Sequence, residues 1–130
     1  MTTERSKQLL DPELYVRLIF AAVVLWVTNV LLIGLWYWQL DRGGPLARGL
    51  HPETPPDFLF PEMDKPEYAP PGWMPQLIDY LYVSLTNATA FNPTDTMPLT
   101  QIAKVLMSVQ SIVALVTIGL VVARAVNILQ

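Results

Sequence analysis

The sequence predicts an all-α membrane protein with two transmembrane helices and, between them, a re-entrant helix and loop. Hydrophobic residues make up 52% of the chain and charged residues only 15%, and the apolar residues are concentrated in long segments. Residues 18–35 contain no charged side chain, so lipid is a better solvent for them than water. A proline-rich segment then separates this stretch from a second long apolar one.

The first transmembrane helix is expected over residues 12–40, after a cytoplasmic segment of residues 1–11. Asp11 and Pro12 form a helix start, because aspartate accepts from free N–H groups and proline fits the first helical position. A helix of this length extends about 43 Å and exceeds a bilayer core of about 30 Å. The Trp-Tyr-Trp run at 36–38 places amphipathic rings at headgroup level, and a Gly-Gly-Pro run at 43–45 ends the helix.

Residues 41–75 are expected to form an extracytoplasmic loop that is rich in proline and in acids. So many prolines exclude a long regular helix. Phe58, Phe60 and Trp73 supply apolar anchors, so we expect an ordered, extended cap and not a flexible linker. The single histidine, His51, lies among polar loop residues and is expected to be solvated.

Residues 76–97 are expected to form a re-entrant helix and a filter-like turn. Apolar residues recur at helical spacing from 76 to about 88. Such a helix covers about 20 Å and cannot cross the bilayer core. The turn after it is rich in hydroxyls, amides and carbonyls, the groups that replace an ion's hydration shell. The candidate pore or filter residues are Thr86, Asn87, Ala88, Thr89, Ala90, Phe91, Asn92 and Asp95.

The second transmembrane helix is expected over residues 98–130, with Pro98 at its start. Lys104 and Arg124 lie about 30 Å apart along an α-helix, so these cations bracket one hydrocarbon thickness. Basic residues are equally numerous on the two sides of the membrane. Their density near the N-terminus favours both termini in the cytoplasm, in a bacterial inner membrane.

Polar residues within the apolar segments are expected to face protein and not lipid. Two interpretations stay open: hydrogen-bonded contacts between helices, which is favoured, or the lining of a polar path. The candidates are Asn29, Ser108, Gln110, Ser111 and Thr117.

Composition argues against several functions. The chain has no cysteine and one histidine, which disfavours disulfides and common metal sites. A net charge of −3 without a basic cluster argues against nucleic acid as a partner. No catalytic set of side chains is apparent, so an enzyme is not expected. No cofactor is expected either, apart from bound monovalent cations in a pore.

The stretch YVSLTNAT at 82–89, followed by a proline-containing turn and a second apolar helix, resembles the pore region of two-helix potassium channels. The resemblance covers residues 76–128 and implies a homo-oligomer, with a tetramer favoured. Thr89, Ala90, Phe91 and Asn92 stand where those channels carry Gly-Tyr-Gly-Asp. Potassium selectivity is therefore not implied.

The stretches LWYWQLDRGGP, PDFLFPEM, DYLYVSLTNATAFNPTDTMPLT and LVVARAVNIL resemble an uncharacterised family of bacterial multi-pass membrane proteins. Members of that family usually carry further helices upstream. The resemblance thus implies a short member, a truncation or an engineered core.

The sequence leads to one main functional hypothesis and one alternative. The main hypothesis is an ion-channel-like oligomer that conducts a cation through the turn at 86–92. The alternative is a non-conducting accessory subunit of a larger membrane complex.

Overall fold

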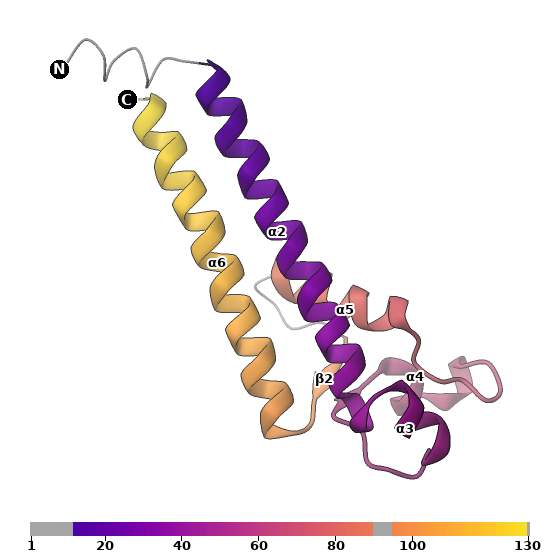
Figure 1. Cartoon of the computed structure of the whole chain (residues 1–130). Helices are drawn as coiled ribbons and strands as arrows, with labels where there is room; N and C mark the ends of the chain where they lie inside the picture. The colour runs from indigo at the N-terminus through magenta and orange to yellow at the C-terminus, as the bar shows by residue number, and fades with distance from the viewer. Residues whose placement is uncertain (1–11, 90–94, 130) are drawn as a thin grey trace.

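The computed structural model describes residues 12–89 and 95–129. Helix α2 (Pro12–Leu40) and helix α6 (Gln101–Leu129) have 29 residues each and lie side by side as an antiparallel hairpin (Figure 1). The start of α2 and the end of α6 lie at one end of the hairpin, which we call the terminal end. The segments that connect the helices lie toward the other, the loop end. Both helices are long and apolar enough to cross a membrane.

Large apolar side chains cover the outer faces of α2 and α6. Phe20 is 70% exposed and Leu120 is 64% exposed, and many leucines, isoleucines and valines of both helices accompany them. Soluble monomers rarely expose apolar patches of more than a few hundred Å². This surface therefore favours lipid or further protein around the hairpin. The prediction of a mainly α-helical chain with two helices that could span a membrane is confirmed.

The connection from α2 to the next long element contains several short helices. They are η1 (Asp41–Gly43), α3 (Pro45–Leu50), α4 (Pro61–Asp64) and η2 (Pro66–Tyr68). Each of α3, α4 and η2 has proline in its first turn, where a missing N–H group has no effect on the helix. The segment expected to be extended is thus partly helical, because its prolines fall where helices begin.

Two short strands connect this segment to the start of α6. Strand β1 (Phe58–Leu59) pairs antiparallel with β2 (Met97–Pro98), so that Phe58 lies opposite Pro98. Pro98, expected at the helix start, lies instead in β2, and α6 begins at Gln101. The strand pairing is a long-range contact that helix-start rules do not detect.

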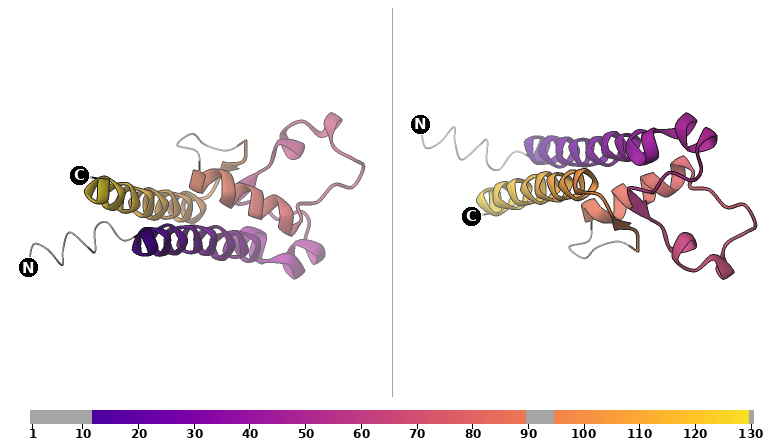
Figure 2. Two further views of the ribbon diagram at one scale, coloured as in Figure 1. Left: turned by 90° about the horizontal axis from the view of Figure 1, so that it is seen from above. Right: turned by 90° about the horizontal axis from the view of Figure 1, so that it is seen from below.

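Helix α5 (Leu77–Thr89) packs against both long helices near the loop end (Figure 2). Gly34 of α2 permits this close approach. A Cβ atom at Gly34 would lie 2.7 Å from Cδ2 of Leu81 and 3.3 Å from Cβ of Ser84. Such contacts require the Leu81 side chain or α5 itself to shift, so a residue without a side chain fits best at this crossing.

The main hydrophobic core lies where α2, β1, α5 and α6 meet. Its buried residues are Tyr37, Phe58, Phe60, Tyr80, Val83, Ala103 and Met107. The rings of Tyr37 and Phe58 lie 5.1 Å apart between centroids, and those of Phe60 and Tyr80 lie 5.2 Å apart at 86°. The tilted pair joins α2 to β1, and the edge-to-face pair holds α5 against the residue after β1, beside the polar side chains described next.

Candidate functional site

A hydrogen-bonded group of uncharged side chains, here called the central polar network, joins the three main helices. Gln110 of α6 lies at its centre and is 1% exposed. The Oε1 atom of Gln110 accepts from the Tyr37 hydroxyl at 2.5 Å and from Nδ2 of Asn87 at 2.9 Å. The members of the network are Asn29, Tyr37, Ser84, Asn87, Gln110 and Ser111.

The amide nitrogen of Gln110 extends the network to α5 and α2. It lies 2.6 Å from Oγ of Ser84 and 3.2 Å from Oδ1 of Asn29. Ser84 in turn donates to the backbone carbonyl of Val30 at 2.7 Å. Each long helix is therefore tied to α5 by buried hydrogen bonds.

Asn87 forms the second junction of the network. Its Nδ2 also donates to the carbonyl of Met107 at 2.9 Å, and its Oδ1 accepts from the Ser111 hydroxyl at 3.1 Å. Every network side chain is uncharged at neutral pH. The network therefore holds α5 in a fixed position between the long helices and offers no group for acid–base chemistry at neutral pH.

The predicted intramembrane polar residues divide into two groups. Asn29, Gln110 and Ser111 meet in the network, as a helix contact requires. Ser108 and Thr117 do not join it, because their hydroxyls donate to carbonyls of their own helix, at Lys104 and Val113 respectively.

The predicted filter residues lie at the end of α5 and beyond it. The hydroxyls of Thr86 and Thr89 donate to carbonyls one turn earlier in α5, at Tyr82 and Leu85 respectively. Ala88 is buried against Val30 and Ala114. Asn87 points into the central polar network. Ala90, Phe91 and Asn92 lie outside the described residues.

Asp95, the last filter candidate, lies apart from the network. It is exposed and lines a hollow of about 240 Å³ together with Asp64 and Lys65. Within residues 12–89 and 95–129, no group of three or more His, Cys, Asp or Glu side chains is arranged to hold a metal ion.

A second polar group, the acid–tyrosine cluster of Asp41, Arg48, Asp57 and Tyr80, lies at the loop end. Asp41 is fully buried. Its two carboxylate oxygens accept from the Tyr80 hydroxyl at 2.5 Å and from the backbone N–H of Asp57 at 2.8 Å. Burial raises the pKa of Tyr80, and the hydrogen bond and negative charge of Asp41 raise it further. Tyr80 therefore remains a protonated donor.

Arg48 completes this cluster by capping α2. Its guanidinium donates to the carbonyls of Trp38 and Asp41 at 2.7 Å each and lies 5.0 Å from the centroid of the Tyr80 ring. Carbonyls at a helix C-terminus lack partners within the helix and favour a cation. From the sequence, Asp41 and Arg48 were only two of the charged residues of the loop at 41–75. The one signal for Asp41 is its position three residues after Trp38, at the end of α2.

Comparison with protein-family models, curated proteins and solved structures finds no match. The functional proposal for this chain rests therefore on the geometry of its own side chains and helices.

Proposed function

We propose that this chain is a membrane subunit of an oligomeric, cation-conducting pore, in which α5 is a re-entrant helix. The observation that carries the proposal is the position of α5 along the hairpin. Its C-terminal part contacts Val30 and Ala114, through Ala88, and these two residues lie near the middle of α2 and α6. Tyr80, near the start of α5, contacts Asp41 at the loop end. A helix so placed descends from one membrane surface and ends in the interior.

Helix lengths support the same proposal. The 13 residues of α5 extend about 20 Å, whereas α2 and α6 extend about 43 Å. Only the long helices cross a core of about 30 Å. Backbone that turns back at mid-depth must be buried by protein or line a wet cavity. An assembly of several chains around the end of α5 supplies such surroundings.

Electrostatics favour a cation as the conducted ion. The C-terminal end of a helix carries a partial negative charge, and α5 directs this end toward the middle of the hairpin. The Thr89 hydroxyl donates its proton to the carbonyl of Leu85, so its oxygen keeps lone pairs with which to accept a cation. Asp95 adds negative charge nearby in the chain.

The assembly that we propose is a homo-oligomer, with four copies favoured by the resemblance to two-helix channels. It lies in a bacterial inner membrane with both termini in the cytoplasm. The residues that we assign to the pore wall are Thr86 and Thr89, whereas Asn87 and Ala88 hold α5 in place.

One observation favours the alternative of a non-conducting accessory subunit. The outward face of α5 carries exposed Ile78, Tyr82 and Leu85. An apolar face of this kind suits packing against a helix of another protein. In this alternative the network and α5 form a docking platform without a pore.

Ion currents across planar bilayers decide between these functions. Purified protein is reconstituted into the bilayer, and the currents carried by K⁺, Na⁺ and Cl⁻ are recorded. A pore predicts cation currents whose reversal potential shifts in Thr89→Ala. Thr28→Ala is the matched control, because Thr28 also donates to a carbonyl four residues earlier but lies exposed on α2. Absence of current for every ion, from protein that is folded and oligomeric, would reject the pore.

A further inference from the structure

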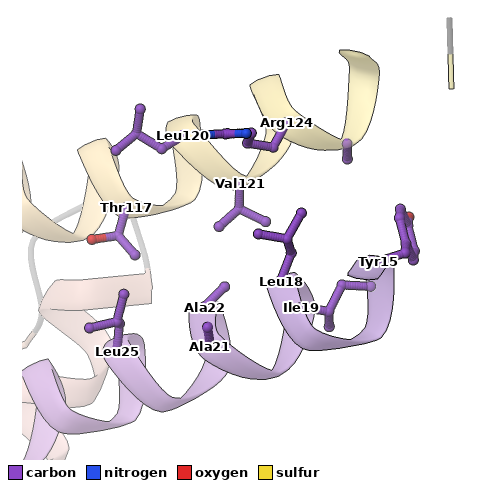
Figure 3. Close-up of a pocket in the computed structure, with 11 residues that line it drawn as sticks. Tyr15, Leu18, Ile19, Ala21, Ala22, Leu25, Thr117, Leu120, Val121 and Arg124 are labelled. Atoms are coloured by element: carbon purple, nitrogen blue, oxygen red, sulfur yellow. The ribbon is translucent and has the colours of Figure 1, made fainter. Parts of the chain in front are cut away.

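A second feature, unrelated to α5, lies between α2 and α6 near the terminal end. Figure 3 shows an opening between the two helices into which small and branched apolar side chains project, with Ala22 and Val121 facing each other across it. Arg124 lies on its border. We call this opening the interhelical slot; its lining residues are Tyr15, Leu18, Ile19, Ala21, Ala22, Leu25, Thr117, Leu120, Val121, Arg124 and Ala125.

The inner wall of the slot offers no free polar donor. The Thr117 hydroxyl donates to the carbonyl of Val113 at 2.8 Å, and the other polar groups of the lining belong to Tyr15 and Arg124. Apolar cavities do not hold water well and accept apolar ligands. The wall therefore selects a hydrocarbon group.

The dimensions of the slot suit a narrow ligand. Its cavity volume is about 220 Å³. A helix is about 10 Å in diameter, whereas a single hydrocarbon chain is far narrower and flexible. The slot therefore suits an acyl chain better than a third helix.

Arg124 adds a charge to this apolar wall. It forms no ion pair with any residue in the described ranges. Arg17, the other arginine at this end among the described residues, is paired with Glu13 at 3.2 Å and does not line the slot. A guanidinium beside an apolar slot is complementary to a phosphate attached to an acyl chain, because it binds two oxygens of one phosphate at once.

We propose that the interhelical slot binds one anionic phospholipid, with an acyl chain between α2 and α6 and the phosphate on Arg124. The inference rests on the membrane placement proposed above but not on conduction. Lys104 and Arg124 are separated by about 30 Å along α6, one hydrocarbon thickness, so Arg124 lies at the edge of the hydrocarbon core, from which its long side chain can reach lipid phosphates. Tyr15 supplies an amphipathic ring at the same level.

Electron paramagnetic resonance with spin-labelled lipids tests this site. The protein is reconstituted in phosphatidylcholine, and the motionally restricted fraction is measured for phosphatidylglycerol and for phosphatidylcholine, both labelled on an acyl chain. One basic residue near an anionic lipid predicts a preference of about fivefold for phosphatidylglycerol. Arg124→Gln is expected to abolish that preference, and Arg17→Gln to preserve it. Equal loss in both variants would indicate general surface attraction and overturn the proposal.

A second pair of variants tests the slot itself. Ala22→Phe fills the slot and is expected to release the restricted phosphatidylglycerol. Ala123→Phe, on an exposed position of α6 outside the lining, is expected to have no such effect. If Ala22→Phe lowers the oligomer mass and leaves the lipid preference unchanged, a second copy covers the slot and the lipid proposal is wrong. Retained lipid preference without ion flux rejects only the pore, whereas protein that restricts no lipid at all rejects the membrane placement.

Discussion

Replacement of Gln110 by leucine removes the centre of the polar network and leaves a side chain of similar size. Gln110 accepts from Tyr37 and Asn87 and donates toward Ser84 and Asn29. Hydrogen bonds between helices in membranes contribute about 0.6 kcal/mol on average and up to about 1.7 kcal/mol. At the average value, four such bonds predict a loss of about 2.4 kcal/mol in the free energy of unfolding.

The loss is measured by titrating the protein from mixed micelles with sodium dodecyl sulfate and following helicity by circular dichroism. Gln101→Leu is the matched control, because Gln101 is exposed in the first turn of the same helix. The control is expected to change the free energy of unfolding by less than about 0.5 kcal/mol. If Gln110→Leu is no more destabilising than Gln101→Leu, the network does not hold α5 against the long helices.

Two further substitutions test the packing of α5 and the loop-end cluster. Gly34→Ala places a Cβ atom in close contact with α5 and is expected to cost about 1 to 3 kcal/mol of unfolding free energy. Gly119→Ala meets no atom within 4 Å and is expected to stabilise α6 by up to about 1 kcal/mol. Equal changes in unfolding free energy for the two variants would contradict the close packing of α5 against Gly34. Tyr80→Phe leaves Oδ2 of buried Asp41 without its hydroxyl donor, although Oδ1 still accepts from Asp57, and is expected to cost about 1.5 to 3 kcal/mol, whereas Tyr68→Phe, at an 80% exposed residue, is neutral. The pKa of Tyr80 is raised in the folded state. Its contribution to the free energy of unfolding is therefore complete below about pH 10 and is lost at higher pH. Denaturant titrations of the protein at about pH 8 and about pH 11 measure this loss.

Local chemistry indicated the existence of the long helices and the end of the first. Among the described residues α2 extends from Pro12 to Leu40, and it ends just after the aromatic run at 36–38, whereas α6 begins at Gln101 and not at Pro98. The short helices after α2 begin with prolines, a signal that the sequence contains but that the high proline content concealed. Each of these features depends on neighbours in the chain.

Contacts between distant residues could not be predicted in this way. Asn29, Gln110 and Ser111 were identified one by one as polar groups in apolar helices, but their meeting with Ser84 and Asn87 depends on how α5 crosses α2. Asn87 was expected among the filter residues, and only the packing of α5 shows its side chain within the network.

The acid–tyrosine cluster could not be predicted for the same reason. Asp41 and Tyr80 are 39 residues apart in the chain, and nothing in their spacing predicts contact. An aspartate in a proline-rich acidic loop is ordinarily solvated. Its burial follows from the packing of β1 and α5 against the end of α2, which only the fold reveals.

The depth of α5 in a bilayer tests the central proposal most directly. The chain contains no cysteine, so spin labels can be attached singly at Ile78→Cys and Thr89→Cys, both on exposed positions of α5. Power saturation with oxygen and a nickel chelate then measures their depths in reconstituted membranes. A re-entrant α5 predicts that the label at 89 lies deeper than the label at 78, by up to about 16 Å. Equal depths for the two labels would show that α5 lies along the membrane surface and would contradict the account.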